Sequence, residues 1–318
     1  MRPQGRENSS GKSERHHVRV LKSTVLSAPD VYSIQTPLIH LDKISQDLDN
    51  SVYAKLESCN PTGSHKDRES RAMIKDALAQ NSSRLVIAST GNAAISLSAL
   101  APCEGISVDV FLSKAIEKVR LRLISTFSPR IHLVPGGYGE AYQESEAFAE
   151  EEEVYNANPG RNKFKIIGDS EIGREIVKQL GTKSPDYIVV PSNNGTLIAG
   201  VWLGSKRVSP SMIAAVAPTS RLMSSIAGYH RLDGRELERT ISESEGQVVP
   251  VTDREAASAL RDLRFDGVFC EPAAAASLAA LKKLGIKRKT VVLVITGTAF
   301  KFLESYASAT RYAASRRT

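Results

Sequence analysis

The sequence predicts an α/β protein with two lobes, each a mostly parallel twisted sheet that helices cover on both faces. Short apolar runs alternate with helical patterns along most of the 318 residues, and this alternation is typical of parallel strands joined by crossover helices. The length is sufficient for two lobes with ample core. A break at Asn158-Pro159-Gly160 marks the expected boundary, because Pro and Gly interrupt regular structure. We therefore expect an N-terminal lobe at 31–160 and a C-terminal lobe at 161–318.

Strands are expected where short runs of apolar and β-branched residues stand between turn residues. These runs lie at residues 52–56, 85–88, 107–112, 131–134, 187–190, 213–216 and 291–295. Helices are expected where apolar residues recur every three or four positions. Such patterns begin at Lys66 and then occupy residues 93–101, 115–126, 140–153, 172–180, 196–208, 254–263, 273–284 and 299–313.

The composition excludes several classes of protein. With 41% hydrophobic and 24% charged residues, the chain is typical of globular proteins, and no apolar run approaches the ~20 residues of a membrane helix. No apolar segment of a secretory signal follows Arg2 and Arg6. The three cysteines are widely spaced, which argues against a disulfide framework or a zinc site. We expect a cytoplasmic protein without a metal, in which the acidic run 150–153 is a solvated helix end.

Much of the net charge of +7 comes from the two ends of the sequence. Residues 1–30 are polar and basic, and we expect them to form a flexible extension. Aromatic residues make up only 6% of the chain and do not alternate with basic ones, so no stacking surface for nucleic acid is predicted. Anionic substrates account for a mildly basic enzyme at least as well.

The most informative single residue is Lys66. It follows the turn signals Asn60-Pro61 and Thr62-Gly63 and begins a helical pattern. We expect the positive end of the helix dipole to help this lysine lose its proton. A neutral amine is the form of lysine that attacks an aldehyde to make a Schiff base.

The run 60–68 resembles the lysine motif of the pyridoxal-phosphate (PLP) enzymes of the tryptophan synthase β-subunit class, also called fold type II, and specifically of threonine synthases. Three further segments resemble motifs of this family in the expected order. Residues 88–94 resemble its asparagine loop, residues 190–196 its phosphate loop, and residues 295–301 the segment that faces the pyridine nitrogen of PLP. The resemblance covers residues 36–301, nearly all of the chain.

This resemblance implies a PLP site with a role for each motif. Lys66 forms the Schiff base and is the catalytic residue, Asn92 hydrogen-bonds the phenolic oxygen, and Thr296 faces the pyridine nitrogen. The phosphate loop lies between an expected strand and an expected helix, the context in which backbone amides bind an anion. Its residues are Ser192, Asn193, Asn194, Gly195 and Thr196, with fewer glycines than is usual in the family.

The expected substrate is an amino acid that is phosphorylated or otherwise activated. Ser89 and Thr90, with Asn92, are expected to bind its carboxylate, and Arg161 its leaving phosphate. His65 stands where the family normally has phenylalanine. Tyr155-Asn156 occupies the position of the family's Asn-Ser pair. Both departures lie where the substrate is selected.

Three functions remain open at this point. The first is a threonine synthase-like reaction of O-phosphohomoserine with water that yields threonine and phosphate, or the reaction of a divergent paralogue. The second is β-replacement on O-phosphoserine or another activated serine, as in cysteate or cysteine synthases. The third is an inactive, regulatory PLP-binding protein. The family resemblance also implies a homodimer, and we expect neither a nucleic-acid nor a membrane partner.

Overall fold

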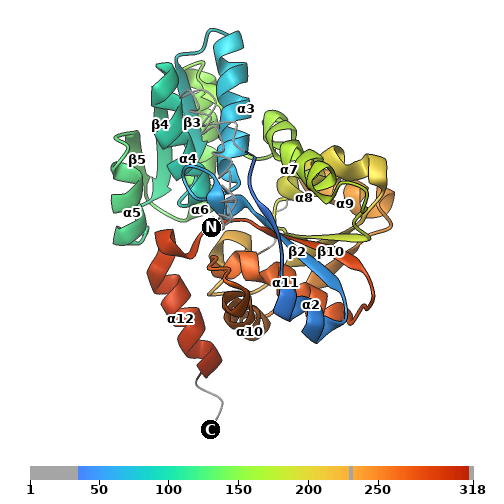
Figure 1. The fold of residues 1–318 in the computed structure, drawn as a ribbon. Helices are drawn as coiled ribbons and strands as arrows, with labels where there is room; N and C mark the ends of the chain where they lie inside the picture. The colour runs from blue at the N-terminus through green and yellow to red at the C-terminus, as the bar shows by residue number, and fades with distance from the viewer. Residues whose placement is uncertain (1–34, 229–231, 315–318) are drawn as a thin grey trace, which may run out of the picture. The chain divides into compact units, whose positions relative to one another are not determined.

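The protein is described by a computed structural model that covers residues 35–228 and 232–314 (Figure 1). The basic extension expected at residues 1–30 lies outside this part. Within these ranges ten strands form two sheets, and helices connect most of them. The α/β class with mostly parallel sheets is therefore confirmed.

The larger sheet has six strands, and its pairs are parallel except for the first. Its order is β1 (Leu38–His40), β2 (Ser51–Leu56), β10 (Thr290–Ile295), β7 (Tyr187–Pro191), β8 (Ser211–Val216) and β9 (Gln247–Pro250). Only β1 and β2 pair antiparallel. The smaller sheet is fully parallel, in the order β5 (Arg130–Val134), β4 (Ser107–Ser113), β3 (Arg84–Ala88) and β6 (Tyr155–Asn156).

The two sheets do not divide the chain at residue 160. Strand β2, from the first part of the chain, pairs with β10 along its whole length, from Ser51 opposite Thr290 to Leu56 opposite Ile295. The larger sheet thus takes strands from both ends of the described chain. The reason is that β10 is a central strand, whose peptide groups need a partner on each side.

The helices cover both sheets. Their bounds are α2 (Asp42–Leu48), α3 (Lys66–Ala79), α4 (Asn92–Leu100), α5 (Lys118–Ser125), α6 (Tyr138–Glu151), α7 (Phe164–Leu180), α8 (Thr196–Ser205), α9 (Gly234–Glu243), α10 (Asp253–Leu263), α11 (Pro272–Leu284) and α12 (Leu303–Ala314). Helices α2 and α9 and the short strands β1, β6 and β9 were not predicted. Strand β6 has two residues, too few to show a period, and α9 carries only Leu237 and Ile241 as large apolar residues.

Helix α7 begins eight residues before its predicted start because Lys165, Gly168 and Asp169 occupy buried positions of its first turns, where apolar residues would show the helical pattern. It packs closely on α8, and glycines permit the approach. A Cβ on Gly173 would lie 2.1 Å from the carbonyl oxygen of Val201, and one on Gly204 would lie 2.0 Å from that of Ser170. Any side chain at these positions would push the helices apart.

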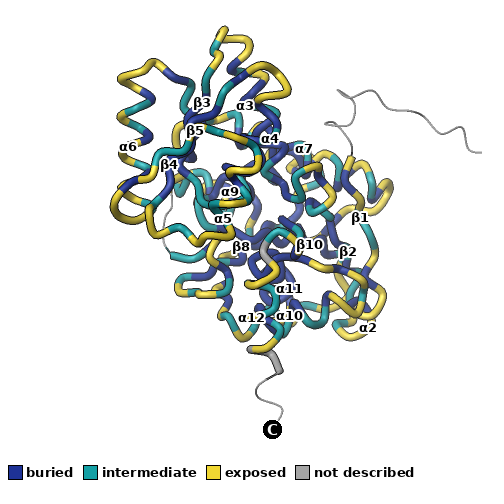
Figure 2. The backbone as a smooth tube through the Cα atoms, turned by 90° about the vertical axis from the view of Figure 1, so that its left-hand side faces the viewer, coloured by how far each residue is buried: buried dark blue, intermediate teal, exposed yellow. Residues whose placement is uncertain are grey.

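Apolar residues of β10 point alternately to the two faces of the larger sheet. Val291, Leu293 and Ile295 belong to a core with α10 and α11, and Val292 and Val294 belong to a second core with α7 and α8. Figure 1 shows these helix pairs on opposite sides of β2 and β10, and Figure 2 shows burial concentrated on the strands and α11. A strand buried on both faces is typical of a parallel sheet. None of the helices in the described ranges has the apolar run that a bilayer-spanning segment requires.

Candidate active site

The segments that follow β2, β3, β7 and β10 line one cavity of about 370 Å³. Because the strands are parallel, their carboxyl ends lie at the same edge of a sheet, where ligands of α/β proteins bind. All expected site residues except Arg161 line this cavity. They are His65, Lys66, Ser89, Thr90, Asn92, Ser192, Asn193, Asn194, Gly195, Thr196 and Thr296.

Lys66 is the first residue of α3 and reaches the cavity, where 24% of its side chain is exposed. Its backbone is held from the larger sheet, since the His65 amide donates to the Thr296 carbonyl over 3.0 Å and Ser64 bridges to Gly297. The lysine segment after β2 and the segment after β10 are therefore one structural unit, although 230 positions separate Lys66 from Thr296.

The ammonium group of Lys66 pairs with Glu69 one turn along α3. Burial disfavours its charge, but Glu69 and Asp169 outweigh burial and raise the pKa of Lys66 above its usual range. The expectation that the helix dipole favours the neutral amine is thus wrong in direction here. A carboxylate in contact acts more strongly than the partial charge of a helix end.

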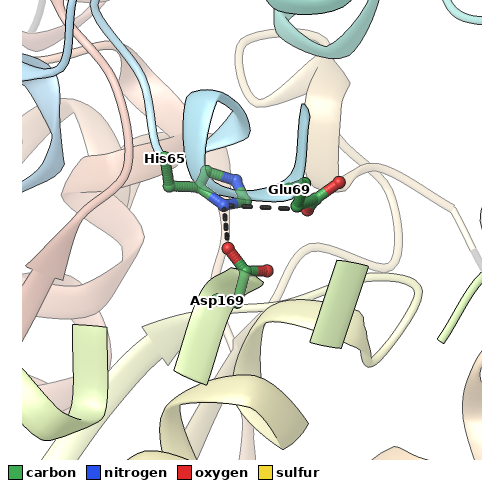
Figure 3. A group of neighbouring side chains, drawn as sticks. All are labelled: His65, Glu69 and Asp169. Atoms are coloured by element: carbon green, nitrogen blue, oxygen red, sulfur yellow. Dashed lines mark hydrogen bonds and ion pairs between the residues drawn. The ribbon is translucent and has the colours of Figure 1, made fainter. Parts of the chain in front are cut away.

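His65, Glu69 and Asp169 form a buried cluster (Figure 3), and Glu69 joins it to Lys66. His65 Nδ1 lies 3.1 Å from Asp169 Oδ1 and 3.8 Å from Glu69 Oε1. Burial, together with the charge of Lys66, lowers the pKa of His65 to about 3, so the imidazole is neutral at physiological pH. Sequence reasoning missed Glu69, although its position three residues after Lys66 is an ion-pair spacing on a helix.

The phosphate loop connects β7 to the N-terminus of α8. Gly195 has φ 97°, and a Cβ there would lie 2.5 Å from the carbonyl oxygen of Asp233, so this position requires glycine. Thr196 donates its hydroxyl to the Asp233 carboxylate. The hydroxyl oxygen of Ser192 is buried without a hydrogen-bond partner among the described residues. The loop thus offers a free hydroxyl beside the unpaired amides of a helix start.

Asn92 and Thr296 share one carboxylate, that of Glu271. Asn92 Nδ2 donates to Glu271 Oε2 over 3.1 Å, and the Thr296 hydroxyl donates to Oε1 over 3.0 Å. The oxygen of the Asn92 side chain is buried and has no hydrogen-bond partner in the described part of the chain. Glu271 lines the cavity and was not predicted, although a Glu-Pro pair before an apolar helical run is a helix-start signal.

Ser89 and Thr90 lie between β3 and the N-terminus of α4. The Gly91 amide donates to the Ser89 hydroxyl over 3.3 Å. Both residues face the cavity on the side of the smaller sheet. They are placed where hydroxyls and helix-start amides bind a carboxylate.

Arg161 is not brought to this cavity. Its side chain is 60% exposed and pairs with Glu146, which also accepts from the Asn156 amide over 2.7 Å. Two other cations line the cavity instead, Arg120 and Lys165. Arg120 donates to the Ser224 hydroxyl over 3.0 Å, and Lys165 Nζ lies 3.0 Å from Glu69 Oε2.

The residues present fit PLP. The cavity has an amine for the aldehyde (Lys66) and a glycine-shaped helix start for the phosphate (Gly195). Two buried oxygens without partners in the described ranges, on Asn92 and Ser192, are available for a polar ligand, because unsatisfied buried polar atoms are rare in proteins.

Comparisons with known proteins identify the family of the chain. The sequence pattern of the family described as "Pyridoxal-phosphate dependent enzyme" matches residues 32–297. Threonine synthase of Methanosarcina acetivorans is 29% identical over 305 residues, covering 84% of this chain and 75% of that protein. Threonine synthase of Halalkalibacterium halodurans is 30% identical over 294 residues, covering 84% and 82%.

Solved structures show the same fold. The processed form of threonine deaminase isoform 2 from Solanum lycopersicum has a TM-score of 0.75 at 20% identity, covering 89% of this chain and 85% of that one. Maize serine racemase has a TM-score of 0.76 at 18% identity, covering 89% and 96%. The family and the relatives support a PLP-dependent lyase that carries out elimination or replacement on an amino acid. The chain belongs to the family of pyridoxal-phosphate dependent enzymes, and its cofactor is PLP.

Proposed function

We propose that this enzyme catalyses a threonine synthase-like reaction, in which O-phosphohomoserine and water give threonine and phosphate. One observation carries the proposal: the residues matched to the lysine, asparagine and phosphate motifs line a single cavity. The threonine synthases similar to this chain along 84% of its length support the choice of reaction.

Each residue has a defined task under this proposal. Lys66 binds the cofactor aldehyde, the loop before α8 binds its phosphate, and Asn92 holds its phenolic oxygen. When bound, PLP supplies an electron-withdrawing ring that stabilises negative charge at the substrate Cα. Thr296 offers only a neutral hydroxyl to the ring nitrogen, which suits elimination and replacement.

Residues of the same cavity also bind the substrate and transfer its proton. Ser89 and Thr90 hold the substrate carboxylate through hydroxyls and helix-start amides. Lys66, once free, accepts the α-proton and returns a proton later in the reaction. General acid–base catalysis of this kind contributes typically ~10²–10⁴-fold to the rate.

The distal anion of the substrate is assigned to Arg120 in place of Arg161. Arg120 reaches the cavity from α5, and its side chain is only 15% exposed, so a charge-assisted hydrogen bond there is poorly screened by solvent.

We expect Arg120→Gln to raise the KM for O-phosphohomoserine about tenfold to a hundredfold, since a hydrogen bond to a charged group contributes about 1.5–3 kcal/mol. The kcat should change little if Arg120 binds substrate and transition state equally. Steady-state phosphate release measures both constants. Arg122→Gln, an exposed change on the same helix, is the matched control. Equal KM values in the two variants contradict the assignment.

The position of Arg161 outside the cavity favours a second candidate, β-replacement on O-phosphoserine or another activated serine. The test is to supply O-phosphohomoserine, O-phosphoserine and O-acetylserine separately, the two serine esters together with sulfide or sulfite as the incoming nucleophile, and to measure the released leaving group and the amino-acid product. Threonine and phosphate from O-phosphohomoserine alone support the leading proposal, and turnover of a serine ester alone supports the second. A regulatory PLP-binding protein would bind PLP and turn over none of them.

We also propose a cytoplasmic homodimer, on the basis of the family resemblance and the scattered cysteines. Sedimentation of the holoenzyme measures the assembly. A monomer at micromolar concentration would contradict the proposed dimer.

A further inference from the structure

A group of charged side chains from α3 and α7 lies directly behind Lys66. The side chain of Glu69 is 1% exposed and that of Asp169 is fully buried. One carboxylate oxygen of Glu69 pairs with the ammonium group of Lys66, and the other oxygen lies 3.0 Å from Lys165 Nζ. Two ammonium groups thus share one buried carboxylate at the wall of the cofactor cavity.

This group contains a possible set of metal ligands whose central carboxylate, that of Glu69, is already paired with ammonium groups. His65, Glu69 and Asp169 offer ligand atoms within 4.8 Å of one another, but each oxygen of Glu69 already lies within ion-pair distance of an ammonium group. Burial, together with the charge of Glu69, raises the pKa of Asp169. Burial opposes the charge of Glu69 as well, but Lys165 and Lys66 outweigh it and lower the pKa of Glu69.

We propose that Glu69 is the positioning residue of Lys66: it holds the amino group at the cavity wall and stabilises the ammonium form that Lys66 adopts when it takes the substrate α-proton. In that step the Cα–H bond breaks, the proton binds Lys66 Nζ, and the electron pair of the broken bond stays with the substrate. This inference rests on the proposed function of Lys66.

Glu69 is the charge in direct contact with Lys66, and the other charged and titratable groups around the pair come from several elements. They are His65 before α3, Lys165 and Asp169 of α7, Asp233 before α9, Glu271 before α11 and Glu57 after β2. Of these, Lys165 competes with Lys66 for Glu69. Removing Glu69 and removing Lys165 should therefore change Lys66 in opposite directions.

The Lys66–Glu69 ion pair favours proton acceptance by Lys66 but opposes the attachment of PLP to it. Lys66 must be a neutral amine to bind an aldehyde, and Glu69 favours its charged form. Loss of the Glu69 charge should therefore speed the attachment of PLP near neutral pH while it slows catalysis. A variant that merely damages the fold would slow both.

The experiment compares the cofactor-free wild type with Glu69→Gln, which keeps the shape and removes the charge. We measure the rate at which PLP becomes covalently trapped by borohydride as a function of pH, and separately the kcat of phosphate release. In Glu69→Gln the midpoint of attachment should fall by about one pH unit or more, which is about tenfold faster attachment near pH 7, and kcat should fall at least about tenfold. Glu171→Gln, a half-exposed carboxylate on α7 outside the cavity, is the control.

Two further variants keep the inference testable if Glu69→Gln does not fold. Lys165→Met should move the attachment midpoint to higher pH, because the Glu69 carboxylate then pairs only with Lys66 and stabilises its ammonium form more strongly. Asp169→Asn removes a second carboxylate that raises the pKa of Lys66. It should lower the midpoint less than Glu69→Gln does, because Glu69 is the carboxylate that pairs with the ammonium group. Unchanged pH dependence in both Glu69→Gln and Lys165→Met, or a joint fall of attachment and kcat, overturns the inference. A borohydride label on a residue other than Lys66 overturns the proposed function instead.

Discussion

Lys66→Ala should abolish covalent PLP binding and lower kcat by at least about 10³-fold, because one side chain supplies both the attachment point and the proton acceptor. Borohydride reduction followed by peptide mapping should place the pyridoxyl label on Lys66 in the wild type and nowhere in the variant. The visible absorbance of the protein-bound cofactor should disappear in parallel.

The peptide mapping must distinguish Lys66 from a second lysine in the cavity. Lys165 lines the same cavity and lies on the far side of Glu69, so label on Lys165 in the wild type would reassign the attachment. Lys178→Ala, an exposed change on α7, should keep both the label and the rate. Retention of the label after Lys66→Ala would contradict the assignment of the whole site.

Gly195→Ala is expected to have the second largest effect, through the phosphate of the cofactor. The backbone at φ 97° is unfavourable for any L side chain, and the new methyl group would lie 2.5 Å from the Asp233 carbonyl oxygen. The loop must then move away from Asp233, the residue that precedes α9. We expect PLP affinity to fall by about a hundredfold or more and the free energy of unfolding to fall by about 1–3 kcal/mol. A PLP titration and a thermal melt measure the two effects.

Gly285→Ala separates backbone strain from the effect on the loop. Gly285 has φ 63° at the end of α11, and a Cβ there would have no neighbour within 4 Å. This variant should lose about 1–2 kcal/mol of stability from the left-handed backbone and bind PLP normally. If Gly195→Ala binds PLP as tightly as Gly285→Ala does, the loop before α8 is not the phosphate site.

The amino-acid order alone led to the fold class, the cofactor and most of the cavity lining. Strand–helix alternation is a local pattern that one sequence reveals, and Lys66, Asn92 and the 192–196 loop stand at strand-to-helix junctions, which the same pattern locates. The short strands β1, β6 and β9 were not predicted, because two to four residues are too few to show a periodic pattern. The pairing of β2 with β10 was not predicted either, since strands more than 230 positions apart leave no local signal in the sequence.

Only the tertiary structure decided which charges meet in the cavity. It buries the Lys66–Glu69 pair of α3 beside Asp169 and Lys165 of α7, and there Glu69, with Asp169, raises the pKa of Lys66 against the expected direction. It also pairs Arg161 with Glu146 outside the cavity and places Arg120 inside it. Electrostatic energies depend on the distances between charged side chains and on their burial. Sequence motifs therefore predict the type of reaction, whereas the pKa values of the reacting groups depend on the folded structure.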